Sequence, residues 1–136
     1  MAQTPVSGTP LFPGASQSLT GTVKNGDTNA PAQLQKVVAT IKAPTGVHTD
    51  SSTPPCSAAD YQLLSPGNTW TINASGDVAT IHPNVELTKA GSSGDTFNIE
   101  DLTVTMVDRA DGTAGDGTGN QDNCKGATFN ITYDAS

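Results

Sequence analysis

Apolar and polar side chains alternate over short stretches of this chain, which is the period of a half-buried β-strand. The alternation is clearest in three runs, at residues 34–43, 97–108 and 127–134. Each run places three apolar residues on one face: Val37, Ala39 and Ile41; Leu102, Val104 and Met106; and Phe129, Ile131 and Tyr133. These runs predict three strands with one buried face each.

Shorter runs predict further strands, and turn residues separate them. The additional strands fall at 18–25, 60–64, 69–73 and 78–87, and Pro83 interrupts the last of them. Seven or eight short strands at this spacing are typical of a sandwich. We therefore expect an all-β fold, an immunoglobulin-like β-sandwich of seven to eight strands over residues 17–136. Residues 1–16 hold three prolines and predict an extended N-terminal arm.

The composition agrees with a single all-β domain that has a lean core. The chain has 136 residues, of which 34% are hydrophobic and 4% aromatic, while fourteen are Gly and nine are Pro. Twenty residues are Thr, which suits a pleated surface. A chain of this length can bury roughly two-thirds of its unfolded surface.

The charge balance argues against nucleic acid and membrane partners. The net charge is −7 and only six residues are basic, at positions scattered along the chain. Phosphate binding needs clustered Lys or Arg, and no apolar run approaches the ~20 residues of a membrane span. The first sixteen residues also lack the basic and apolar regions of a signal peptide, so we expect none.

Cys56 and Cys124 are the two cysteines, and a disulfide between them is the favoured interpretation. Neither His48 nor His82 stands at metal-ligand spacing from a cysteine, and the Pro-rich flank of Cys56 offers no positive setting for a catalytic thiol. A bridge closing a loop of about 70 residues would contribute about 4 kcal/mol in the chain-entropy model. Two free buried thiols remain the alternative. A persistent disulfide implies an oxidising destination.

Three segments resemble small Ig-like domains of actinobacterial secreted proteins and of virion proteins from phages of those bacteria. They are LFPGASQSLTGTVKNGD, from Leu11, then CSAADYQL, and finally NQDNCKGATFNITY. The resemblance covers about residues 11–134 and implies the Ig-like fold and the bridge between a Cys before Asp-Tyr and a Cys before Lys-Gly. It implies no reaction.

The loop before Cys124 carries carboxylates that could bind calcium, but it lacks EF-hand spacing, so we expect no metal and no other cofactor. Its weak candidate ligands are Asp108, Asp111, Asp116 and Asp122, with Asn120 beside them.

An internal isopeptide bond would need Lys24, Asn130 and either Glu86 or Glu100. Strand alternation turns both Lys24 and Asn130 toward solvent, which disfavours it.

The sequence gives little support for catalysis. It has two histidines and no Gly-x-Ser-x-Gly elbow, and the paired carboxylates Glu100 and Asp101 would point to opposite faces of one strand. We therefore expect that the protein is not an enzyme. A carbohydrate-binding module would show a row of exposed aromatic residues, whereas the few aromatic residues here fall mostly at core positions.

These observations together favour a structural virion protein, most simply a bacteriophage capsid decoration protein on the virion surface. Its partner would be the major capsid protein, and a homo-oligomer such as a trimer would fit. The uncharged arm is the candidate binding segment, through Pro5, Pro10, Leu11, Phe12 and Pro13. The alternatives are that Leu11 and Phe12 complete the domain's own core, or that the chain is a secreted or cell-surface Ig-like domain whose signal Met1 replaced.

Overall fold

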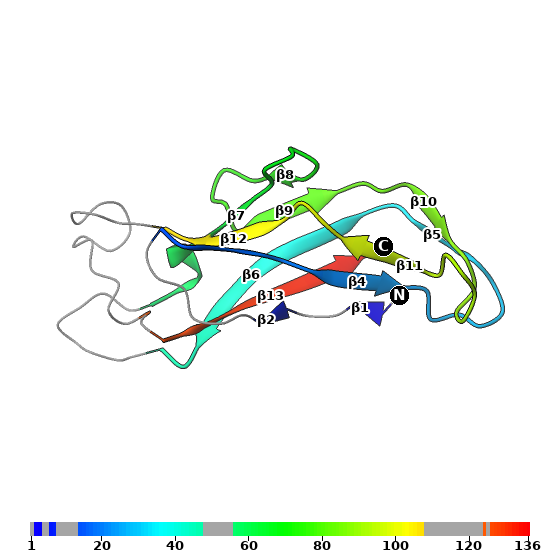
Figure 1. The fold of residues 1–136 in the computed structure, drawn as a ribbon, viewed down its shortest axis with the longest axis horizontal. Coiled ribbons are helices and arrows are strands. Elements are labelled where there is room, and N and C mark those ends of the chain that lie inside the picture. Colours follow the sequence, from blue (N-terminus) through cyan, green and yellow to red (C-terminus); the bar gives the residue numbers. More distant parts are fainter. Residues whose placement is uncertain (1, 4–5, 8–13, 48–55, 108–123, 125) are drawn as a thin grey trace.

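A computed structural model describes residues 2–3, 6–7, 14–47, 56–107, 124 and 126–136. These residues form an all-β, sandwich-like fold whose strands run roughly along the long axis of the molecule (Figure 1). The strands are β1 (Ala2–Gln3), β2 (Val6–Ser7), β3 (Ser16–Ser18), β4 (Gly21–Lys24), β5 (Ala32–Leu34), β6 (Val37–Thr45), β7 (Tyr61–Leu64), β8 (Thr71–Ile72), β9 (Val78–Ile81), β10 (Val85–Leu87), β11 (Thr96–Ile99), β12 (Thr103–Met106) and β13 (Thr128–Ala135). One short 3₁₀ helix, η1 (Ala58–Asp60), precedes β7.

One layer is built from two short antiparallel sheets that continue one another. Their strand orders are β1-β4-β11 and β3-β12-β7. The pair Ile99↔Gly21 belongs to the first sheet and Thr103↔Ser18 to the second. Between them the Leu19 amide donates a hydrogen bond of 2.8 Å to the Leu102 carbonyl. The segments 16–24 and 96–106 therefore pair along their length, with a break in the middle.

The other layer is a five-stranded antiparallel sheet of order β2-β13-β6-β9-β8, together with the pair β10-β5. Here too the short pair prolongs the longer sheet, because Val37↔Ile81 joins β6 to β9 and Leu34↔Val85 joins β5 to β10. Pro83 lies at the interruption of the second strand, as predicted.

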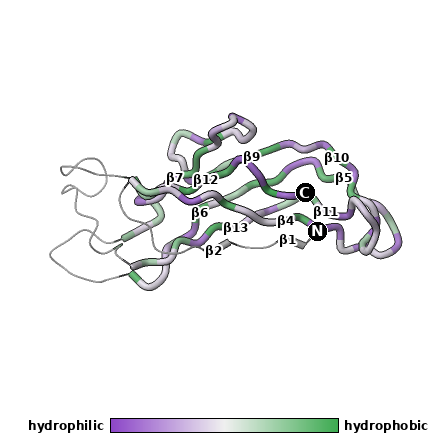
Figure 2. Tube along the Cα trace, viewed as in Figure 1, coloured by the Kyte–Doolittle hydropathy of each residue, from purple (hydrophilic) through white to green (hydrophobic). Residues whose placement is uncertain are grey.

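The core lies between these layers and uses the alternating residues of the sequence. Val37, Ala39 and Ile41 are buried, as are the predicted inward faces of β12 and β13. The rings of Tyr61 on β7 and Phe129 on β13 lie 6.2 Å apart and connect one layer to the other. Figure 2 shows hydrophobic and hydrophilic positions alternating along the strands.

The structure corrects the prediction of one continuous strand through 97–108. The strand ends at Ile99, and a new one begins at Thr103. Asp101 adopts a left-handed backbone conformation with φ 56°, which no strand residue adopts and which Asp tolerates better than most residues. Glu100 and Asp101 are therefore turn residues, and the prediction that they face opposite sides of a strand was wrong.

Candidate functional site

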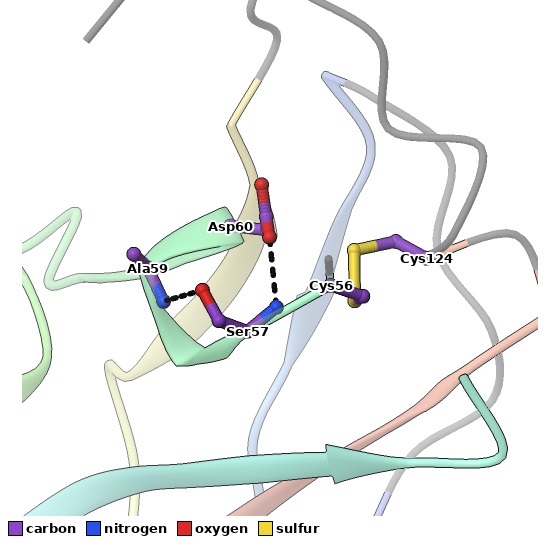
Figure 3. Close-up of a disulfide and its surroundings, with 5 residues drawn as sticks. All are labelled: Cys56, Ser57, Ala59, Asp60 and Cys124. Atoms are coloured by element: carbon purple, nitrogen blue, oxygen red, sulfur yellow. Dashed lines mark hydrogen bonds between the residues drawn. A yellow bond between two sulfur atoms is a disulfide. The ribbon is translucent and has the colours of Figure 1, made fainter. Parts of the chain in front are cut away.

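The structure joins Cys56 and Cys124 in a disulfide, as the sequence predicted (Figure 3). Their Cα atoms are 5.0 Å apart, although 68 positions separate them in sequence. Cys124 is buried and Cys56 is half-buried. The bridge connects the turn before β7 to the segment that leads into β13, and therefore ties together the two layers of the fold.

A capping box follows Cys56 and fixes the backbone beside the disulfide. The Ser57 hydroxyl accepts a hydrogen bond from the Ala59 amide at 3.3 Å, while Oδ2 of Asp60 accepts one from the Ser57 amide at 2.9 Å (Figure 3). This reciprocal arrangement satisfies backbone donors at the start of a helical turn. It also places the Asp60 side chain, which is only 6% exposed, inside the protein.

Asp60 is the site residue that the sequence analysis missed. Its carboxylate and the sulfur atoms of Cys56 and Cys124 lie within 4.8 Å of one another. The spacing Ser-x-x-Asp directly after Cys56 is a capping-box signature, and this local signal could have placed the carboxylate beside the first cysteine. The result is a buried acidic group against a disulfide.

Tyr61 connects this site to the core. Its hydroxyl is buried and, among the described residues, finds no hydrogen-bond partner. Burial, and after it the charge of Asp60, raises the pKa of Tyr61 above its ordinary value. The Val107 amide donates to the Asp60 carbonyl at 2.9 Å, which ties the turn to the end of β12. Asp60 is therefore held by the Ser57 amide on its side chain and by the Val107 amide on its carbonyl.

A second polar cluster surrounds Asp101 at the break between β11 and β12. Its carboxylate accepts hydrogen bonds from the Ser65 hydroxyl at 2.7 Å, the Gly67 amide at 2.6 Å and the Thr69 amide at 3.1 Å. These donors, with Ser65 the strongest, hold the pKa of Asp101 far below its usual range. The indole of Trp70 donates to the Glu100 carbonyl at 2.8 Å. The cluster clamps the 65–69 turn to the strand break.

A half-open groove of about 210 Å³ lies beside this clamp. Its lining combines the half-buried apolar side chains of Ile81 and Phe97 with polar groups of Thr69, Asn98, Glu100 and Asp101. The Asp101 oxygens are already occupied by the turn. We therefore regard the clamp as structural.

Asn25 organises the loops at the end of the molecule that β5 and β10 reach in Figure 1. Its amide nitrogen donates to the carbonyls of Ala30 and Thr88, at 2.9 and 3.0 Å, and its oxygen accepts from the Asp27 amide. The Asn25 side chain is only 3% exposed. A fully bonded buried amide of this kind fixes the loops and leaves no donor for a ligand.

The isopeptide candidates are engaged elsewhere. Lys24, whose side chain is 54% exposed, forms an ion pair of 3.5 Å with Asp95. Asn130 is half-buried rather than turned fully to solvent, and its amide donates to the Ala43 carbonyl at 3.0 Å. Glu86 and Glu100 are exposed. These contacts give no buried Lys–Asn–carboxylate set.

The aromatic side chains belong mostly to the core, as predicted. Trp70, Tyr61, Phe129 and Tyr133 are all buried. Among the aromatic residues that the structure describes, Phe97 is the half-buried exception, and it lines the groove. Burial raises the pKa of Tyr133 to about 12. His82 is exposed.

The other predicted site residues lie outside the described part of the chain. They are the arm residues Pro5, Pro10, Leu11, Phe12 and Pro13, the loop carboxylates Asp108, Asp111, Asp116 and Asp122, and also His48 and Asn120. Of the arm, the structure describes two strands. β1 pairs with β4 through Ala2↔Lys24, and β2 pairs with β13 through Val6↔Ile131.

Comparison with known families, curated proteins and solved structures gives no match to this chain. Among the described residues, no helix has the length and apolar character needed to cross a membrane.

Proposed function

We propose that this chain is a non-enzymatic structural protein of a phage particle, a capsid decoration protein that acts by binding the particle surface. The observation that carries the proposal is the Cys56–Cys124 disulfide. A stable disulfide suits a protein that works in oxidising surroundings, and a virion released from its host meets such surroundings. The resemblance of residues 11–134 to Ig-like domains of virion proteins supports the same assignment.

An immunoglobulin-like topology fits the two layers and their antiparallel pairing. Such sandwiches bind partners through loops or through an added strand. Here both β1 and β2 are outermost strands, one in each layer. We propose that the arm borders the binding surface on the major capsid protein, and that its two short pairings position it there.

A carbohydrate-binding module is the weaker alternative because most of the described aromatic side chains are buried in the core. Sugar rings stack on exposed aromatic faces, whereas Trp70, Tyr61, Phe129 and Tyr133 are at most 4% exposed. A secreted or cell-surface domain shares the disulfide and remains the second candidate. Gene neighbourhood separates the two, since capsid and tail genes would flank a decoration protein.

Co-sedimentation with capsids of the encoding phage tests the proposal. We expect the full chain to sediment with capsids that lack it, and a variant without residues 2–12 to remain folded but stay in the supernatant. Leu11→Ser/Phe12→Ser is the milder form of the same change. Leu64→Ser and Val85→Ser are matched controls, because they remove the exposed apolar side chains of β7 and β10, outside the arm.

The outcomes distinguish an arm that binds the capsid from an arm that completes the core of the domain. A truncated protein that unfolds shows that the arm belongs to the core. A truncated protein that folds and still sediments fully places the interface elsewhere. A full chain that never sediments with capsids contradicts the virion assignment and leaves the secreted domain.

A further inference from the structure

The strand β11 presents an open edge at the side of the sandwich. It is an outermost strand of the sheet β1-β4-β11, and among the described strands only β4 pairs with it. The Asn25 amide donates to the Asp95 carbonyl at 2.9 Å, so Asp95 and, two positions on, Phe97 turn their backbone groups toward β4. In an antiparallel pair every second residue bonds to the same neighbouring strand. The backbone groups of Thr96 and Asn98 therefore point away from the sheet.

Both ends of this edge are closed by hydrogen bonds within the chain. Before β11, the Gly94 carbonyl accepts the Thr88 amide at 3.1 Å. After β11, the Glu100 carbonyl accepts the Trp70 indole at 2.8 Å. The open part of the edge is therefore short, and it comprises the two outward-facing residues between these contacts. An exposed strand edge is common by itself, so a binding site needs a second feature beside it.

The groove of about 210 Å³ is that second feature. Ile81 of β9 and Phe97 of β11 line it from the two layers of the sandwich, and both side chains are half-buried and packed against the core. The groove therefore opens between the layers at the edge of β11. Pockets for small-molecule ligands are usually about 300–1,000 Å³. The groove is smaller than that, and its size suits a single apolar side chain presented by a polypeptide.

The charge of the groove indicates which kind of segment it would accept. Glu100 is exposed, and Asp101 is held in its charged form because the donors of the 65–69 turn keep its pKa far below the usual range. The described ion pair of the chain involves neither carboxylate. A second copy of this chain, with a net charge of −7, would bring more negative charge, and residues 1–16 carry no charge at all. Both are poorer matches than a basic segment of another protein.

We propose that the open edge of β11 and the groove beside it bind an extended segment of a partner protein, in which Lys or Arg stands two positions from an apolar residue. The segment adds to β11 as a further antiparallel strand and bonds to the backbone of Thr96 and Asn98. Its apolar side chain enters the groove between Ile81 and Phe97. Residues two positions apart share one face of a strand, so the basic side chain lies along the groove toward Glu100. This surface is separate from the arm and does not rest on the virion assignment.

Hydrogen exchange followed by NMR on the ¹⁵N-labelled full chain tests strand addition directly. The probe is the peptide Ac-Lys-Thr-Leu-Thr-Lys-NH₂, which has a basic residue two positions from Leu in either chain direction. We expect the amides of Thr96 and Asn98 to exchange fast in the free protein and that of Phe97 to exchange slowly. At about ten times the dissociation constant, only about one-tenth of the protein is free, so the two outward amides should exchange about tenfold more slowly.

Matched peptides separate the three parts of the recognition. Replacement of Leu by Ser removes the apolar side chain and should weaken binding at least about tenfold. Replacement of both Lys by Glu should do the same through charge repulsion. In an antiparallel addition the amides of the two Thr residues face β11 and that of Leu faces away. N-methylation of both Thr residues should therefore abolish the protection of Asn98, whereas N-methylation of Leu should leave it.

One substitution in the protein tests the acidic side of the groove. Glu100→Gln should weaken binding of the probe by about two- to fivefold at low salt, the size expected of an exposed ion pair. Asp134→Asn removes one negative charge from an exposed position on β13, outside the groove, and should bind as the wild type does. Equal affinities of the two variants would contradict the role of Glu100.

Three further results would overturn the proposal. The first is unchanged exchange of the Asn98 amide at saturating probe, and the second is equal binding of the Lys and Glu peptides. The third is protection of the Asn98 amide in the free protein that rises with protein concentration, which would assign the edge to a second copy of the chain. None of these results bears on capsid binding by the arm, which co-sedimentation tests separately.

Discussion

The amide of Gly67 donates a hydrogen bond of 2.6 Å to Oδ1 of Asp101, across 34 positions of sequence. The approach is so close that a Cβ atom on Gly67 would lie 2.9 Å from Oδ2 of the same carboxylate. Asp101 also occupies a left-handed conformation at the break between β11 and β12. This contact therefore fixes the point at which the chain passes from one sheet to the next within a layer.

Gly67→Ala should destabilise the fold by about 1–2 kcal/mol, because the added methyl group must displace a carboxylate held by several hydrogen bonds. Urea denaturation measures the change. Gly26→Ala is the matched control, since nothing lies within 4 Å of the position of its Cβ atom. Equal stability of the two variants would show that the turn can move away from Asp101 at no cost.

Acidification should lower the free energy of unfolding by protonating the Asp101 carboxylate. The folded-state pKa of Asp101 is lowered, so its stabilising effect is fully present above the unfolded-state pKa of about 3.9 and is lost as the pH falls below that value. Asp101→Asn should make the decline of unfolding free energy on acidification shallower. Some decline remains, since the Gly91 amide and the Thr96 hydroxyl also lower the pKa of Asp95.

Urea unfolding of Asp101→Asn between about pH 5 and pH 2 measures this difference. Asp134→Asn, at an exposed position on β13, controls for the loss of one negative charge. A wild-type pH profile in Asp101→Asn would contradict the role assigned to the clamp.

Gly76→Ala should be among the most destabilising substitutions of a turn residue in this protein. Gly76 has φ 77°, and a Cβ atom there would collide with Cγ of Gln62. Gly91 has a similar φ of 88° but open space around it. The difference in melting temperature between Gly76→Ala and Gly91→Ala therefore isolates the collision from the backbone strain, and equal losses would rule the collision out.

The alternation of the sequence predicted most strands because it is a local property. Val37, Ala39 and Ile41, for example, are buried as their period of two required. The division of 97–108 into two strands could not be predicted in this way. It depends on Asp101, whose partners Ser65, Gly67 and Thr69 lie more than thirty positions away.

The candidate site at the Cys56–Cys124 disulfide was also predictable in part, because part of its signal is local in the sequence. With only two cysteines in the chain, one intramolecular pairing was open, and the structure contains it. The Ser57–Asp60 capping box has a local signature, but the convergence of Asp60 with Cys124 is a product of the tertiary fold.

Removal of the disulfide should lower the free energy of unfolding by about 4 kcal/mol, since the bridge closes a long loop in the unfolded chain. The variant is Cys56→Ser/Cys124→Ser, compared with wild type by urea denaturation without reductant. Wild-type protein in excess reductant should match the variant. A loss below about 1 kcal/mol would mean that the bridge adds little to the closure of the fold.

The disulfide supports the proposed destination of the protein, so its presence in native protein is the central claim. The direct measurement is intact mass after alkylation without reductant, on protein isolated from its native source. We predict a mass two hydrogen atoms below that of the reduced chain and no alkylation until reductant is added. Quantitative alkylation of both Cys56 and Cys124 in the native protein would contradict the account.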